Sequence, residues 1–296
     1  MNLNSKNIID GVVCFLRDEP SRIVIDTSFE DQSFYTKNLF YKIIKKIEDR
    51  FKKEAFLLSM NHYLVDRKKI LYYNFCWGLY PPSNSVSFGD KFDFTYLCGY
   101  PRKDKIQMLS NLFKYGLLEN ALWSCGSLDK INFSIKNLEL PNLPKVLDYD
   151  KAQKAIPFCW NSINIDFYKD SRFSLVQETE MVSYSNRYTE KTYKSIAIKH
   201  PFIVAGNYGV LKALRREGFK TFHPFINESY DDIKNRDERI CLIIREVMKL
   251  CIKDEQSWQL FIEKIQPILD YNYIKYKSNY EKAKLEQSKH HPNVNQ

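Results

Sequence analysis

Short apolar segments alternate with amphipathic segments along both halves of this 296-residue chain. In the first half, residues 22–29 and 55–60 have the composition of strands, and residues 38–54 between them carry apolar side chains at helical spacing. In the second half, the strand-like residues 172–180 precede the helical residues 189–200. Strands that alternate with helices favour parallel sheets, which bind ligands at the carboxyl ends of their strands. The pattern therefore predicts an α/β protein.

Further segments continue the alternation. Glycines close two of the helical segments, at Gly116 and Gly218, because a glycine with positive φ commonly ends a helix. The remaining predicted strands are residues 68–80, 92–99, 158–168, 201–206 and 219–225, and the remaining predicted helices are residues 103–116, 207–218, 237–254 and 255–287.

A domain boundary is expected where this alternation weakens, after Ser127. The stretch LELPNLPKVLDYD in this region carries two prolines in a polar setting, as segments between domains often do. We therefore predict one domain over residues 1–145, a second over residues 146–270, and a C-terminal helix with a mobile tail over residues 271–296.

The formal net charge of +9 indicates a negatively charged partner, such as nucleic acid, an anionic lipid surface or a phosphate-bearing substrate. Only 9 glycines argue against a glycine-rich nucleotide loop as the main binding device. No apolar run approaches the ~20 residues that cross a bilayer, and residues 1–20 lack the features of a signal peptide. We therefore expect a cytoplasmic protein without a transmembrane segment.

The cysteines and histidines do not form a metal-binding pattern. The 7 cysteines are scattered and never spaced as C-x-x-C, so we expect reduced and mostly buried thiols. Among the 5 histidines, His290 and His291 lie in a polar tail and the others stand alone.

Thr189-Glu190-Lys191 stands at the start of a predicted helix. Thr189 is a favourable N-cap, because its side chain can accept a hydrogen bond from a first-turn amide. Glu190 suits the positive end of the helix dipole, whereas the cation Lys191 does not. Lys194 lies one turn further on the same face. Cations placed where amides already attract negative charge predict an anion site, although a charged first turn in a solvated loop explains the same residues.

Two stretches of the second half resemble known glycosyltransferases. FSLVQETE, followed by RYTEKTYKSIAIKHPFIVAGN, resembles the donor-binding segment of α1,3-fucosyltransferases and related GT-B enzymes. The run HPFIVAGNYGVLKALRREGFKTFHPFINESYDD is similar to glycosyltransferase-like proteins of large viruses and phages, as is YLCGYPRKDKIQMLSNLFKYGLLENALWS. The resemblance covers roughly Phe94 to Asp254.

The resemblance implies a GT-B-like fold, with two Rossmann-like domains whose parallel sheets face a central crevice and with C-terminal helices packing back. Residues 1–145 would then be the acceptor side and residues 146–270 would bind the nucleotide sugar. A viral member of this group would act in the host cytoplasm.

Site residues carried over from these families lie mainly around the T-E-K motif. Glu190 would bond the donor ribose, Lys191 would bind the diphosphate, and Glu178 would contact the sugar or nucleoside. Thr189 and Lys194 complete this part of the predicted donor site. Thr179 stands where the fucosyltransferases have asparagine, which leaves the donor open.

Fucosyltransferases also use an upstream arginine on the diphosphate. The candidates in this chain are Arg102, Lys105, Arg172 and Arg187. We favour Arg102 and Lys105, because the viral group also has basic residues just after the end of the corresponding strand.

The catalytic base of an inverting transfer is a carboxylate or an imidazole, which GT-B enzymes mostly supply from the N-terminal domain. Asp26 and Glu30 follow a predicted strand and are the first candidates; His62 follows another and comes next. A polar loop between strand and helix explains each of them equally well.

Polar residues of the stretch FINESYDD are further candidates. Asn227, Glu228 and Asp231 follow a predicted strand, where they would either touch the sugar or cap a helix.

Asp148-Tyr149-Asp150 matches the D-x-D motif, in which two carboxylates hold a divalent ion against a diphosphate. The motif follows no predicted strand and lies in the expected linker. We therefore expect no metal and no cofactor besides the donor substrate.

The function predicted from the resemblance is transfer of a hexose or pentose from a nucleotide-diphospho-sugar to an acceptor hydroxyl, with inversion and without a metal. The acceptor would be a glycan, a lipid-linked sugar or a hydroxymethylated base in DNA, which an enzyme reaches by flipping the base out. The net charge and the basic-aromatic residues 271–284 fit a polyanion. The alternative is a non-catalytic nucleic-acid-binding protein.

Overall fold

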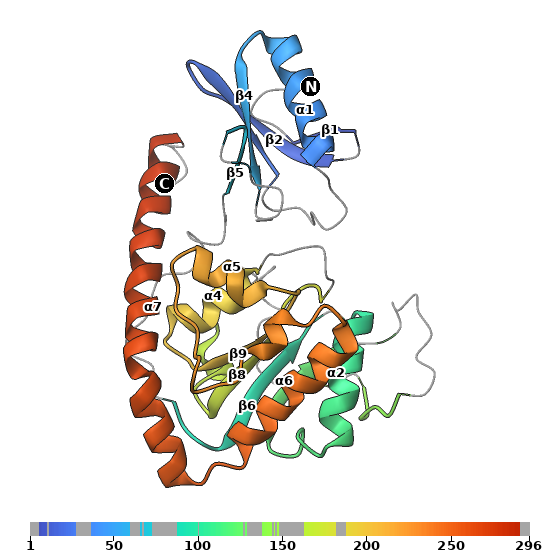
Figure 1. The fold of residues 1–296 in the computed structure, drawn as a ribbon, viewed down its shortest axis with the longest axis vertical. Coiled ribbons are helices and arrows are strands. Elements are labelled where there is room, and N and C mark those ends of the chain that lie inside the picture. Colours follow the sequence, from blue (N-terminus) through green and yellow to red (C-terminus); the bar gives the residue numbers. More distant parts are fainter. Residues whose placement is uncertain are drawn as a thin grey trace. The chain divides into compact units, whose positions relative to one another are not determined.

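The computed structural model describes residues 6–10, 12–27, 37–59, 66, 68–72, 88–99, 101–126, 128, 138–143, 145, 147, 163–181 and 188–290. The chain divides into two compact units (Figure 1). The first comprises Met1–Phe75 and Tyr184–Arg187, and the second comprises Cys76–Ser183 and Tyr188–Gln296. Each unit combines its own β-sheet with α-helix, α1 in the described part of the first unit and several helices in the second, which confirms the α/β class.

The first unit is built on a mixed five-stranded sheet with the order β1-β2-β3-β4-β5. β1 and β2 pair antiparallel, as do β2 and β3, whereas β3, β4 and β5 are parallel. Helix α1 buries Phe40, Ile43, Ile44 and Ile47 in the same apolar core as the strands. The elements are β1 (Lys6–Ile9), β2 (Val12–Asp18), β3 (Arg22–Asp26), α1 (Lys37–Phe51), β4 (Glu54–Ser59) and β5 (Ile70–Tyr72).

β1 and β2 were not predicted, and they make this sheet mixed where a parallel one was expected. The chain reverses at Asp10, which has a φ of 50°, and again between Glu19 and Arg22, whose backbones exchange two hydrogen bonds. Turns this short join only antiparallel strands, because a parallel pair needs a crossover of about a dozen residues or more.

The second unit is built on a four-stranded parallel sheet with the order β7-β6-β8-β9. Every residue of β7 and β9 is buried, so helices and loops cover both faces of the sheet. The elements are β6 (Phe92–Cys98), α2 (Lys103–Lys114), β7 (Ala121–Cys125), β8 (Ser171–Gln177), α4 (Glu190–Ala197), β9 (Phe202–Ala205), α5 (Val210–Arg216), α6 (Arg236–Cys251) and α7 (Glu255–His290).

The strand order reverses between β6 and β8. Helix α2 carries the chain from β6 outward to β7, and the chain then returns to place β8 on the other side of β6. α4 continues in that new direction to β9. The connections leave β6 and β8 in opposite directions, and at such a switch point a parallel sheet opens a crevice beyond the carboxyl ends of its strands.

The domain boundary predicted near residue 146 lies within the second unit. β6 and β7 precede that position but pair in one sheet with β8 and β9, which follow it. Lys145, in the proline-containing stretch, forms an antiparallel bridge with Cys125. Proline and polar residues in this stretch predicted a boundary between domains, but hydrogen bonds between distant strands determine where a unit ends.

Two predicted strands are absent from the described residues. Within 158–168, residues Ile165–Phe167 form a 3-10 turn. Residues 219–225 form no strand, because their amides bond to side chains: Lys220 N donates to Asn272 Oδ1 at 2.8 Å and Phe222 N donates to Glu228 Oε1 at 2.7 Å. Gly116 and Gly218 have φ values of 70° and 88°, which confirms that they end the preceding helices.

Helix α7 packs back on the second unit. The rings of Tyr276 on α7 and Tyr193 on α4 have centroids 5.7 Å apart. The predicted helix over residues 255–287 is confirmed, and α7 runs without a break through residue 270, where the predicted C-terminal segment would begin (Figure 1). The helix contains Pro267. None of the helices in the described ranges combines the length and the apolar character that a bilayer-spanning helix requires.

Candidate functional site

A pocket of about 360 Å³ lies at the switch point between β6 and β8. Four elements of the second unit line it: the end of β6, the start of α2, the carboxyl half of β8, and α4. The lining residues are Thr95, Leu97, Gly99, Arg102, Lys105, Tyr168, Ser174, Leu175, Val176, Gln177, Thr179, Glu190, Lys191 and Lys194. The strand order thus brings residues near position 100 beside residues near position 190.

Two helices begin at this pocket. Arg102 is the N-cap of α2 and Thr189 is the N-cap of α4, and neither side chain accepts a hydrogen bond from its helix. A helix start carries partial positive charge from its first-turn amides. Both helix starts therefore favour an anion in the pocket.

Positive side chains outnumber negative ones in the pocket. Arg102, Lys105, Lys191 and Lys194 line it, and Glu190 is the single carboxylate among the described lining residues. Lys105 is only 5% exposed. In the described part of the chain, no carboxylate oxygen lies within 4.0 Å of its Nζ. A buried ammonium without such a partner is costly, so an anionic ligand would offset this cost.

The electrostatics of Lys105 agree with its position. Burial lowers the pKa of Lys105 below its ordinary value; Lys191 and Arg102 lower it further, while Cys98 and Asp104 act in the opposite direction. An anion bound beside Lys105 would favour the charged form.

Glu190 and Lys191 form an ion pair on the pocket wall. Lys191 Nζ lies 2.7 Å from Glu190 Oε1, and it donates to Thr179 Oγ1 and Thr189 Oγ1 at 3.1 Å each. Burial opposes the charged form of Glu190, but the attraction of Lys191 and further hydrogen bonds outweigh burial, and its pKa is lowered. Glu190 is therefore held as a carboxylate and Lys191 is held in a fixed position.

Glu178 supports the start of α4 from the end of β8. Its side chain is buried, and its carboxylate accepts hydrogen bonds from Thr189 N at 3.0 Å, Thr189 Oγ1 at 2.5 Å and Thr192 Oγ1 at 2.6 Å. The expected side-chain cap by Thr189 is therefore absent, because its hydroxyl donates to Glu178 instead of accepting from an amide. Glu178 is not among the residues that line the pocket.

Substituting Glu178 with alanine is expected to destabilise the protein by about 2–3 kcal/mol, because three donors would lose a charged acceptor in a buried position. Thermal unfolding followed by circular dichroism measures the change. Glu263→Ala, which removes an exposed carboxylate from α7, is the matched control and should shift the melting temperature little. Equal shifts for the two variants would contradict the proposed support of α4.

The other predicted site residues lie in several places. Asp26 ends β3 in the first unit and has its Oδ2 3.5 Å from Arg17 Nη2. Glu30, His62 and Arg187 lie outside the described residues.

The three polar candidates of the stretch FINESYDD accept hydrogen bonds from backbone amides. Asp231 accepts from Leu211 N and Lys212 N at the start of α5, at 2.9 and 3.0 Å. Glu228 accepts from Phe222 N and Asn227 accepts from Ser229 N. Asp231 and Asn227 thus accept from amides at helix starts, as in the capping alternative, whereas Glu228 bonds an amide outside any helix; none of the three lines the pocket.

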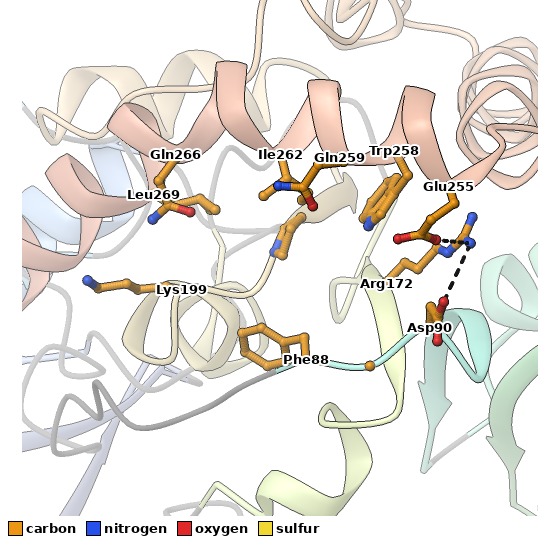
Figure 2. A pocket seen from close by; sticks show the side chains of 12 residues that line it. Phe88, Asp90, Arg172, Lys199, Glu255, Trp258, Gln259, Ile262, Gln266 and Leu269 are labelled. Atoms are coloured by element: carbon orange, nitrogen blue, oxygen red, sulfur yellow. Dashed lines mark hydrogen bonds and ion pairs between the residues drawn. The ribbon is translucent and has the colours of Figure 1, made fainter.

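A second pocket, of about 480 Å³, lies at the opposite edge of the sheet, beside α7 (Figure 2). Its cations are already neutralised: Arg172 Nη2 lies 3.2 Å from Glu255 and 4.0 Å from Asp90, and Lys199 Nζ lies 2.8 Å from Asp270. Ligands of parallel sheets bind at the carboxyl ends, and this pocket lies at the amino ends of β8 and β9. Arg172, one of the four alternative candidates for the upstream diphosphate ligand, thus lies away from the candidate site.

Sequence reasoning missed several residues of the candidate site, including Thr95, Ser174 and Gln177. Gln177 accepts a hydrogen bond from the buried Tyr96 hydroxyl at 2.5 Å. All three lie within predicted strands, but only Gln177 is at a carboxyl end, where a ligand residue is expected; Thr95 and Ser174 lie in the middle of β6 and β8 and carried no such signal.

A metal site is not evident in the described ranges: no group of three or more His, Cys, Asp and Glu side chains there is placed to hold an ion. The D-x-D motif at residues 148–150 lies outside those ranges.

Comparison with known proteins gives two similar structures. The sequence matches no protein-family model and no curated protein. A crystal structure of an α1,3-fucosyltransferase with GDP-fucose is 14% identical, covers 63% of this chain and 48% of its own length, and has a TM-score of 0.25. A second, with GDP, is 11% identical, covers 75% of this chain and 71% of its own, and has a TM-score of 0.31. This chain thus spans about half the length of the first structure.

Proposed function

We propose that the protein is a GT-B-like glycosyltransferase and that the pocket holds the diphosphate of a nucleotide-sugar donor. The observation that carries the proposal is the gathering of four cations, Arg102, Lys105, Lys191 and Lys194, around one carboxylate at the switch point of a parallel sheet. The sequence resemblance to α1,3-fucosyltransferases supports the same assignment.

The four cations would bind the diphosphate of the donor and would also stabilise the negative charge that grows on it during transfer. Lys105 and Arg102 at the start of α2, and Lys191 at the start of α4, provide charge-assisted hydrogen bonds from two directions. When the bond between sugar and diphosphate breaks, negative charge grows on the diphosphate. Fixed positive groups stabilise that charge without reorganising, which is the usual source of rate enhancement at such a site.

Glu190 is proposed to accept a hydrogen bond from a hydroxyl of the donor ribose. Its ion pair with Lys191 keeps it charged and leaves carboxylate lone pairs for a second donor. Glu178 acts through α4 in this proposal, since it holds the helix start that carries Glu190 and Lys191.

The finer features are part of the same proposal. The transferred group is a hexose or pentose, the transfer inverts the anomeric carbon, and no metal takes part. A base from the first unit, with Asp26 as first candidate ahead of Glu30 and His62, removes the acceptor proton. The acceptor is a glycan or a hydroxymethylated base in DNA, and the net charge of +9 fits a polyanionic acceptor.

A donor screen tests the proposal. UDP-, GDP-, CMP- and dTDP-sugars are added in turn, and the donor that binds the native state should raise the melting temperature. In Lys191→Ala the loss of a charge-assisted hydrogen bond of about 2 kcal/mol should weaken this donor ~30-fold and reduce release of nucleoside diphosphate. Lys264→Ala, which removes an exposed lysine from α7, is the control and should behave as wild type.

The opposite result would favour the nucleic-acid-binding alternative. No donor would then shift the melting temperature, and salt-sensitive binding of DNA would be the same in wild type and Lys191→Ala.

A further inference from the structure

Cys98 and Cys125 lie side by side at the carboxyl ends of β6 and β7. They are direct partners in the parallel ladder, so both side chains project from the same face of the sheet. Their thiols are hydrogen-bonded to each other. Each cysteine is 1% exposed, and no disulfide joins the five cysteines that the structure describes. The proposed donor site does not use either thiol.

The backbone around this pair is held in place from both sides. Gly126 N donates to Cys98 O at 3.0 Å, and Cys125 exchanges two hydrogen bonds with Lys145, at 2.9 and 3.0 Å. A Cβ on Gly126 would lie 2.4 Å from Gly99 O, so the two backbone segments that follow the cysteines also approach each other closely. Adjacent strands lie ~4.8 Å apart, which falls within the ~4.4–6.8 Å between Cα atoms that a disulfide spans.

The charge of Lys105 acts on both thiols, in the direction that lowers the pKa of each. The hydrogen bond from Cys125 lowers the pKa of Cys98, and Lys105 lowers it further, although burial acts in the opposite direction. The same hydrogen bond, together with burial, raises the pKa of Cys125. The thiolate is the reactive form, and Cys98 directly precedes Gly99, a residue that lines the pocket. We therefore assign Cys98 as the nucleophile and Cys125 as the thiol that resolves it.

We propose that Cys98 and Cys125 are a modification site, at which a peroxide converts the paired thiols into a reversible disulfide. The Cys98 thiolate attacks one oxygen of hydrogen peroxide; an S–O bond forms, the O–O bond breaks, and the leaving hydroxide takes a proton from solvent to become water. The Cys125 sulfur then attacks the Cys98 sulfur; the S–S bond forms, the S–O bond breaks, and the second oxygen leaves as water with the Cys125 proton. Two thiols are oxidised and one peroxide is reduced to two waters.

The disulfide would form next to the candidate anion pocket. Gly99, which follows Cys98, lines that pocket, and so does Lys105, whose charge favours the Cys98 thiolate. An anion bound to Lys105 would reduce this effect, because it offsets the positive potential at Cys98.

Peptide mapping of the full-length protein tests the proposal. The folded protein is treated with hydrogen peroxide, remaining thiols are alkylated, and trypsin is added without reductant. Residues 92–102 and 115–130 are tryptic peptides with one cysteine each. A species that joins these two peptides, two hydrogens lighter than their sum and lost after dithiothreitol, is the expected result.

Variants and an unfolded sample make this result specific. Cys241→Ser, at an exposed cysteine, should keep the linked peptides, and Cys125→Ser should leave a Cys98 sulfenic acid that dimedone traps. The same oxidation in urea should give mixed pairings. Oxidation of the folded protein that yields single oxidised cysteines, or that links Cys98 to Cys14 or Cys251 as often as to Cys125, would overturn the proposal.

Adding pyrophosphate tests whether an anion bound at Lys105 slows the oxidation of Cys98. This experiment rests on the proposed function. Slower cross-linking with saturating pyrophosphate supports a Lys105 shared by anion and thiolate. An unchanged rate overturns that link, and the linked peptides then still establish the disulfide.

Discussion

Replacing Lys105 with methionine is expected to weaken binding of pyrophosphate or GDP ~10- to 150-fold, because one charge-assisted hydrogen bond is worth about 1.5–3 kcal/mol. The same change should stabilise the ligand-free protein by about 1 kcal/mol, since a buried ammonium without a carboxylate within 4.0 Å in the described ranges is exchanged for an apolar chain of similar length. Calorimetric titration gives the affinity, and thermal unfolding without ligand gives the stability. Function and stability thus change in opposite directions.

The matched control for this prediction is Lys103→Met. Lys103 lies two residues earlier on α2 and is exposed, so its loss should leave both quantities nearly unchanged. A Lys105→Met protein that binds pyrophosphate as wild type does would show that the pocket cations do not act on a phosphate.

The pH dependence of stability provides a second measurement on Lys105. Burial lowers its pKa in the folded protein below the ordinary 10.5. Between the lowered value and 10.5 the unfolded chain binds more protons at this position than the folded chain, so stability rises with pH in that window. Affinity for pyrophosphate should fall in the same window, as the folded protein loses the proton. Lys105→Met should lack both trends.

Replacing Arg239 with methionine is expected to destabilise the second unit by about 3–5 kcal/mol, because two buried and two partly buried carbonyls would lose their donor together. Arg239 lies on α6 and is 1% exposed. Its guanidinium donates to Gly206 O at 3.1 Å, Met181 O at 2.8 Å, and the carbonyls of Ile233 and Lys234 at 2.5 and 3.2 Å. Met181 follows β8 and Gly206 follows β9, so the Arg239 side chain connects the segments after these two strands to the segment that precedes α6.

Urea unfolding followed by tryptophan fluorescence measures this loss. Arg245→Met removes an exposed arginine from the same helix and should change the free energy of unfolding by no more than about 0.5 kcal/mol. Arg239→Lys keeps the charge but lacks the planar fork, so it should restore only part of the lost stability. Full restoration by lysine would mean that charge, and not the four-way hydrogen bonding, is what matters at this position.

The helices and most strands were predictable because their signals are local. The spacing of apolar residues located α1, α2, α4 and α6, and Gly116 and Gly218 confirmed two helix ends by their positive φ. β7 was not predicted, since ALWSC is five residues long and follows a helix end without a clear turn signal. Residues 219–225 contain phenylalanines typical of strands, but side chains of α7 and of the following loop bind their amides instead of a neighbouring strand.

Most of the cations of the candidate site were predicted from the sequence, but their arrangement was not. The T-E-K motif indicated cations at a helix start, and the resemblance indicated Arg102 and Lys105 as further cations. The role of Glu178 was not visible, because a carboxylate at the end of a strand has the same sequence signature whether it faces a ligand or accepts bonds from Thr189 and Thr192.

The sequence by itself determined the periodic elements, the ends of several helices and the positions of cations along the chain, since these depend on residues within a turn or two of one another. Only the tertiary structure decided that β6 lies between β7 and β8, and strand order follows from which apolar faces pack together over distances that no local pattern encodes. This strand order places Lys105 and Lys191 in one pocket and pairs Cys98 with Cys125 in neighbouring strands.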